Sequence, residues 1–125
     1  MWDRYAELGD TDRSTLSEQD QQLFAILDLR QEVNSGGFDS YFRYWGGNTA
    51  EVALKGLPRM LGEGWASLLR EAMGLFGTAY PTDPDARFAA IDALGLEEAL
   101  DALDQRLYDL EGAEDVDSRL EAFPK

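Results

Sequence analysis

Apolar and polar residues recur along this chain with the period of an α-helix in almost every segment. In residues 17–33 the apolar side chains cover a broad part of the helix surface, which indicates a central helix. Ser17 can cap its start, and the pair Gly36 and Gly37 ends it. Because a second helix follows directly, we predict a positive φ at one of these two glycines.

A short aromatic helix follows the glycine pair. Phe38, Tyr41, Phe42 and Trp45 fall at positions i, i+3, i+4 and i+7, which lie on one helix face. We expect Phe38 and Phe42 to pack back on the preceding helix. Tyr44 points away from the shared face and is therefore the aromatic residue that we expect on a contact surface.

The next helix is predicted from the apolar stripe in residues 50–61, with Asn48 or Thr49 as its cap. Pro58 lies inside this stripe. It lacks the N–H that would bond to the carbonyl of Leu54, so we expect a kink or a break near this position.

The second half of the chain continues the helical pattern. The expected elements are an apolar stripe in 65–76, a helix capped by Asp83 with Pro84 at its first position, a leucine stripe in 96–110 after Gly95, and a short helix in 116–123. The pattern predicts an all-α fold: a single compact domain of about six helices. We place this domain at residues 16–125, after an N-terminal segment of residues 1–15.

The charge of the chain is strongly negative. Twenty-five acids face 11 bases, giving a formal net charge of -14, and residues 83–125 alone hold 13 acids and 4 bases. This charge repels nucleic acid and anionic membrane surfaces, and it attracts cationic partners. We therefore expect a basic protein as the partner and no direct binding to nucleic acid or membranes.

The chain contains no histidine and no cysteine. It therefore lacks the commonest general base, the thiol nucleophiles and most ligands of transition metals. We expect no catalytic residue, no metal site and no cofactor. The first residues have no signal-peptide layout and no apolar run is long enough to span a bilayer, so we expect a cytoplasmic protein.

The leucine helix carries acids on the side away from its leucines: Glu97, Glu98, Asp101, Asp104, Asp109 and Glu111. At roughly 1.5 Å rise per residue, successive acids from Glu98 to Asp109 are about 4.5 to 7.5 Å apart along the axis. Phosphates on one DNA strand advance about 3.4 Å per step, so one such helix is sparser than DNA. Two such faces, joined in a dimer, approach the charge pattern of a duplex. From spacing alone, an ordinary solvated face explains these acids as well.

Two motifs resemble a known family. The stretch "EVNSGGFDSYF" supplies the first motif, with Glu32, Asn34, Gly36, Gly37, Phe38, Tyr41 and Phe42 as its matching residues. Leu103, Asp104, Arg106 and Tyr108 supply the second motif. Together they resemble the bacterial acidic DNA-mimic protein family over roughly residues 16–123.

The resemblance implies an all-helical acidic protein, a homodimer, and carboxylates that imitate DNA phosphates on the DNA-binding surface of a transcription regulator. The candidate phosphate mimics are the six helix acids, together with Glu114, Asp115 and Asp117. The first motif is interpreted as structural: its glycines turn the chain and its aromatic residues pack. The motif match of Asp104 also allows internal pairing with Arg87 or Arg106.

Two other functions remain open at this point. One is an immunity or inhibitor protein that neutralises a cationic toxin or nuclease through charge. The other is a carboxylate-dependent hydrolase, for which a deep cleft with buried carboxylates of raised pKa would be expected.

Overall fold

The computed structural model describes residues 1–8 and 12–123, and in this part of the chain it contains helices and no strand. The α-helices are α1 (Trp2–Leu8), α2 (Glu18–Arg43), α3 (Ala50–Met60), α4 (Glu63–Gly74), α5 (Pro84–Leu94), α6 (Glu97–Ala113) and α7 (Val116–Ala122), with the short 3-10 segments η1 (Arg13–Thr15) and η2 (Trp45–Thr49). The predicted all-α fold is confirmed. The two helices predicted on either side of the glycine pair form one bent helix, α2, and α1 in the N-terminal segment was not predicted.

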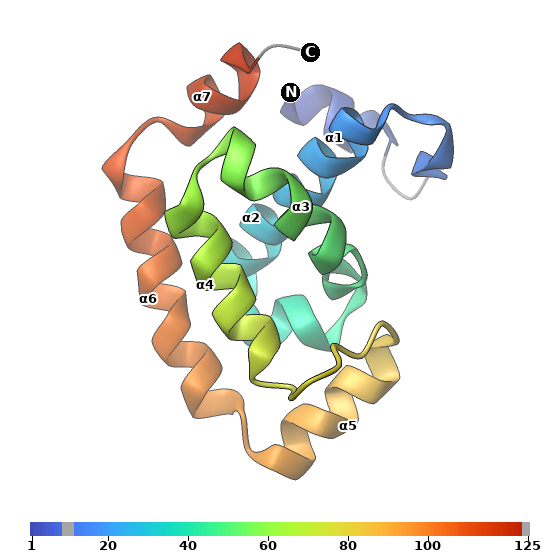
Figure 1. Cartoon of the computed structure of the whole chain (residues 1–125), viewed down its shortest axis with the longest axis vertical. Coiled ribbons are helices and arrows are strands. Elements are labelled where there is room, and N and C mark those ends of the chain that lie inside the picture. Colours follow the sequence, from blue (N-terminus) through green and yellow to red (C-terminus); the bar gives the residue numbers. More distant parts are fainter. Residues whose placement is uncertain (9–11, 124–125) are drawn as a thin grey trace.

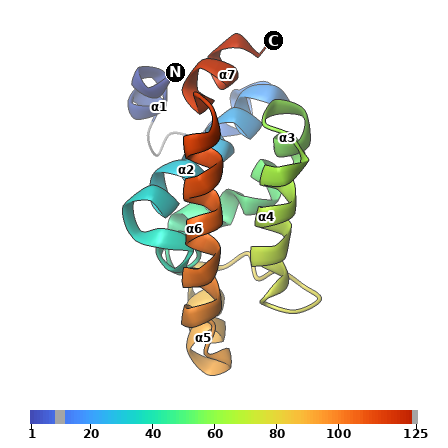
Figure 2. The same ribbon diagram turned by 90° about the vertical axis from the view of Figure 1, so that its left-hand side faces the viewer.

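The long helix α2 forms the centre of the molecule. It packs against α3, η2, α5 and α6, while α4 lies between α3 and α6 (Figures 1 and 2). Helices α1 and α7 lie at one end of the molecule, and α5 lies at the opposite end (Figure 1). This placement explains the broad apolar surface predicted for α2, since neighbours cover it on several sides.

The start of α2 and the turn at its glycines agree with the sequence. The Ser17 hydroxyl accepts a hydrogen bond from the N–H of Asp20 at 3.1 Å, which caps the helix. Gly37 has φ 80° and ψ 175°, so the helix bends there, and the predicted positive φ is confirmed. Phe38 follows directly and is buried in the core.

The aromatic helix is shorter than predicted. Its helical backbone ends at Arg43, and residue 45 already belongs to η2. Trp45 therefore leaves the helix face that it was predicted to share with Phe38, Tyr41 and Phe42, and it is half exposed. Tyr44 is exposed, as its position off the aromatic face indicated.

Thr49 stands at the cap position of α3, as predicted, but its side chain makes no capping hydrogen bond. Its hydroxyl donates to Asp28 instead, and the Asn48 side chain accepts from Arg87. The helix does not break at Pro58 but continues to residue 60. The proline lies in the last turn, where the missing backbone hydrogen bond affects only the end of the helix.

Arg87, on α5, is completely buried and joins three segments of the chain. Its guanidinium donates to the carbonyl oxygens of Phe42 (2.7 Å), Tyr44 (3.0 Å) and Pro81 (3.1 Å), and to the Asn48 side chain (2.6 Å). These bonds hold the turn after α2 against α5. No carboxylate of the described residues pairs with this guanidinium, so the pairing with Asp104 considered above is wrong.

Candidate functional site

The acids of α6 that face solvent are Glu97, Glu98, Asp101 and Asp109. Asp109 accepts a hydrogen bond from Gln105 at 3.0 Å, one turn earlier on the same helix. Within the part of the chain that the structure describes, Glu98 and Asp101 have no hydrogen-bond donor or cation beside them. Their charges are therefore free to act outside the molecule.

Asp104 lies one turn after Asp101 and is only partly exposed. Its Oδ1 accepts a hydrogen bond from the backbone N–H of Phe38 at 2.7 Å. Burial raises the pKa of Asp104, the bond from this N–H opposes the rise, and the charges of Asp101 and Asp39 add to it. Pairing with Arg106 is also wrong, because α6 turns that side chain towards Glu71 on α4.

Glu111 and Asp117 surround the buried guanidinium of Arg30 on α2. Two nitrogens of Arg30 reach the Glu111 carboxylate at 2.9 and 2.8 Å, and a third reaches Asp117 at 2.7 Å. The Trp2 indole also donates to Asp117 at 3.0 Å. Burial alone would raise the pKa of Asp117, but the bonds from Arg30 and Trp2 outweigh it and lower the pKa. These two acids therefore connect α2, α6 and α7.

The remaining two predicted acids lie at the start of α7. Glu114 is exposed and pairs with Arg119 at 2.6 Å. Asp115 caps α7: its carboxylate accepts from the N–H and the hydroxyl of Ser118 at 3.1 and 2.8 Å. These bonds to Ser118 lower the pKa of Asp115, which favours the charged form of the cap.

An ion-pair network that the sequence analysis missed extends the acidic surface beyond α6. Arg43, near the end of α2, binds Asp39 at 2.8 Å, Asp92 at 3.0 Å and Glu97 at 3.1 Å. Its guanidinium also lies 4.3 Å from the centre of the Phe88 ring. Only the spacing of Asp39 and Arg43, four residues apart on one helix, could have been found from the sequence.

We call Asp39, Asp92, Glu97, Asp101 and Asp104 the acidic cluster. Three helices, α2, α5 and α6, contribute to it, and among the described residues Arg43 is the one base that pairs with its members. The side chains of Asp92 and Glu97 are 57% and 51% exposed. Three of the five carboxylates share the single positive charge of Arg43, so the cluster keeps a net negative charge and attracts cations.

The motif residues are mostly structural. Phe38, Tyr41 and Phe42 are buried against one another and the neighbouring helices. The Asn34 amide donates to the Arg30 carbonyl at 2.7 Å and to Glu111 at 2.9 Å. A side chain at Gly36 would overlap Ser40, with its Cβ 2.7 Å from that of the serine.

Two kinds of site are not formed by the described residues. In residues 1–8 and 12–123, no three acidic side chains converge in a way that could hold a metal ion. The helices of the same ranges contain no apolar run of the length that a bilayer requires.

Comparison with known proteins places most of the chain in one family. A family model described as DMP19-like protein matches residues 14–125. No curated protein and no solved structure matches the chain.

Proposed function

This chain belongs to the DMP19-like protein family, and on that premise we propose that it is a non-enzymatic DNA mimic. Its partner is a basic protein, such as a transcription regulator, and it binds the surface with which that protein contacts DNA. The family match and the net charge of -14 support this proposal. Carboxylates on the acidic chain take the place of phosphates towards the arginines and lysines of the partner.

The acidic cluster carries the proposal. It joins acids from three helices, which gives a two-dimensional array where α6 alone would offer a single sparse row. Glu98 and Asp109 extend this array on the outer side of α6. Glu111 and Asp117 contribute less, because both bind the buried guanidinium of Arg30, and Asp115 contributes less because its carboxylate caps α7.

A homodimer would place two such arrays on one particle. This is the arrangement in which the spacing of the acids comes nearest to that of a duplex. Sedimentation at neutral pH tests it: a monomer at micromolar concentration would leave each array to act alone.

The experiment compares two triple variants that change the charge equally. The test variant carries Glu97→Gln and Asp101→Asn in the acidic cluster and Glu98→Gln beside it. The control variant carries Glu7→Gln, Glu121→Gln and Asp3→Asn in α1 and α7, at the other end of the molecule (Figure 1). All six side chains are exposed, so neither variant should unfold. Asp104 is left unchanged because it bonds to the backbone of α2.

Each immobilised protein is incubated with lysate of the source cells, and retained proteins are eluted with salt or with duplex DNA. We expect the wild type and the control variant to retain the same DNA-binding protein and the test variant to lose it. Elution should occur steeply with salt and also with duplex DNA. Retention that survives in the test variant, or that duplex DNA cannot displace, would show that this surface does not mimic DNA.

A further inference from the structure

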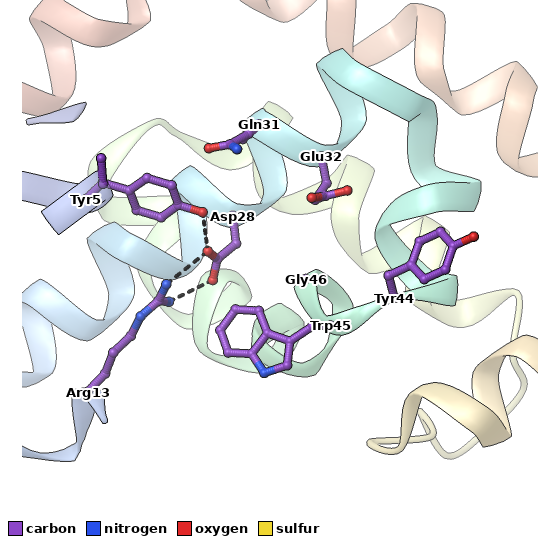
Figure 3. A pocket seen from close by; sticks show the side chains of 9 residues that line it. Tyr5, Arg13, Asp28, Gln31, Glu32, Tyr44, Trp45 and Gly46 are labelled. Carbon is purple, nitrogen blue, oxygen red and sulfur yellow. Dashed lines mark hydrogen bonds and ion pairs between the residues drawn. The ribbon is translucent and has the colours of Figure 1, made fainter. Parts of the chain in front are cut away.

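A cavity of about 410 Å³ opens between α1, α2 and the turn after α2. Two carboxylates, Asp28 and Glu32, lie one turn apart on α2 and both line it. Three aromatic residues, Tyr5, Tyr44 and Trp45, also line it, and the Tyr44 ring points away from Asp28 (Figure 3). Carboxylates beside aromatic faces form an environment that favours cations. This cavity is separate from the acidic cluster.

One wall of the cavity already holds a guanidinium from the chain itself. Arg13 donates two hydrogen bonds to Asp28, at 2.7 and 3.1 Å (Figure 3). Its guanidinium carbon lies 5.2 Å from the centre of the Trp45 ring and 5.8 Å from that of Tyr5. The same wall therefore recognises a guanidinium by a two-point bond to a carboxylate and by aromatic faces. Asp28 is neutralised by this contact.

Glu32 is the carboxylate of the cavity that no cation neutralises in the described part of the chain. Its one hydrogen bond there is long, 3.3 Å from the Ser40 hydroxyl. Gly46 permits its position, because a Cβ at residue 46 would lie only 3.0 Å from the Glu32 Cγ. Next to it, Tyr44 and Trp45 are 59% and 50% exposed. The Glu32 carboxylate and the accessible part of the Trp45 ring thus remain available to a ligand.

We propose that this cavity binds the guanidinium of an arginine side chain supplied by the partner protein. Glu32 accepts its N–H groups, and the planar group stacks on the exposed ring of Trp45. Arginine fits better than lysine. The planar guanidinium can donate two hydrogen bonds to a carboxylate and stack on a ring at the same time, while the ammonium of lysine is a compact, strongly hydrated charge. The proposed function is needed only to name the source of the arginine.

The site is tested with N-acetyl-arginine amide, titrated at constant ionic strength and followed through the backbone amide signals of Gln31 and Gly46. N-acetyl-lysine amide, which carries the same charge, is titrated in parallel. We expect saturable shifts with a dissociation constant roughly in the millimolar range, as for any single side chain. The lysine probe should bind at least about threefold more weakly.

Three variants locate the binding. Glu32→Gln should weaken the arginine probe about fivefold or more, because a charged acceptor is replaced by a neutral one. Trp45→Ala should weaken binding of the arginine probe about threefold. This variant still tests the site if Glu32→Gln proves unstable. Glu98→Gln, which removes an equal charge from α6, should leave binding unchanged.

Absence of saturable shifts, equal binding of the lysine probe, or equal weakening by Glu98→Gln would each overturn the proposal. The first outcome means no site, the second a site without arginine preference, and the third a general attraction to the negative chain. The triple change at Glu97, Glu98 and Asp101 should not alter probe binding. If the probe fails while that triple variant still loses its protein partner, the cavity proposal falls and the proposed function stands.

Discussion

The carboxylate of Asp104 on α6 accepts a hydrogen bond from the backbone N–H of Phe38, at the point where α2 bends. Gly37 leaves the helical conformation directly before this N–H. The second part of α2 therefore begins like a helix, whose first N–H groups need acceptors from outside. Asp104 provides one from a residue 66 positions later and so connects the bend to α6.

Replacing Asp104 tests this capping role. Asp104→Ala should lower the free energy of unfolding by about 1 kcal/mol, the usual loss for a helix cap. Asp104→Asn should cost less, because its side-chain oxygen can still accept from Phe38. Urea unfolding of both variants measures the difference. An alanine variant as stable as the wild type would mean that water accepts the hydrogen bond of this N–H equally well.

Gly37 is required for both its backbone conformation and its contact with Asp104. A Cβ at this position would overlap the Asp104 carboxylate, and φ 80° with ψ 175° is a conformation that only glycine adopts readily. Gly95 also has a positive φ but nothing within 4 Å of a Cβ placed there. We expect Gly95→Ala to cost about 1 kcal/mol and Gly37→Ala at least about twice as much. If both variants lose the same stability in thermal or urea unfolding, the Asp104 side chain moves aside and the overlap at residue 37 costs nothing extra.

The sequence was sufficient where a feature depends on neighbours along the chain. Helical periodicity predicted α4 and α6, the cap at Asp83 was confirmed by its bond to Ala86, and the glycine pair predicted the bend. These features follow from local backbone geometry, which residue types determine directly.

Features that depend on which helices meet were not predictable in the same way. The ion pairs of Arg43 with Asp92 and Glu97 join residues about 50 positions apart. Periodicity indicates which side of a helix is buried, but it does not indicate the partner that covers it. The burial of Arg87 and the internal use of Glu111 and Asp117 were missed for the same reason.

Tyr41 has a buried hydroxyl with no hydrogen-bond partner among the described residues. Removing a buried polar group that lacks a partner is neutral or stabilising. We therefore expect Tyr41→Phe to unfold at the same or a higher urea concentration than the wild type. Tyr80→Phe is the control: its hydroxyl bonds to the Gly47 carbonyl, so its loss should cost about 1 kcal/mol. A clear loss in Tyr41→Phe would reveal a water-mediated partner.

The pH dependence of stability should have opposite signs at two aspartates. The folded pKa of Asp117 is lowered, so its contribution is complete above the ordinary pKa of about 3.9 and disappears as the pH falls through the folded pKa. The folded pKa of Asp104 is raised, so ionisation costs stability as the pH rises above about 3.9.

Asparagine variants separate these two contributions. As the pH is lowered from neutral to about 3, the wild type should lose its advantage over Asp117→Asn. Over the same range its stability relative to Asp104→Asn should rise. Urea midpoints at several pH values measure both trends, and parallel curves for the two variants would contradict the assigned shifts.

Arg87 gives the most demanding test of the fold, because its buried guanidinium serves three carbonyl oxygens and one amide oxygen. Lysine keeps the charge but lacks the several N–H groups of the planar guanidinium, so Arg87→Lys leaves several of these acceptors without a donor. Each unsatisfied buried acceptor costs about 1–3 kcal/mol, so we expect a loss of at least about 3 kcal/mol. Arg106→Lys, in an exposed pair with Glu71, should change stability by less than about 1 kcal/mol.

Hydrogen exchange then distinguishes a local from a general effect of Arg87→Lys. The carbonyl oxygens that it binds belong to the end of α2 and the turn that carries Trp45, so exchange should accelerate first in residues 42–48. α6 makes none of these bonds and should exchange more slowly than that turn in the variant. Uniform acceleration throughout the chain would mean that Arg87 stabilises the whole core, and that the turn has no special dependence on it.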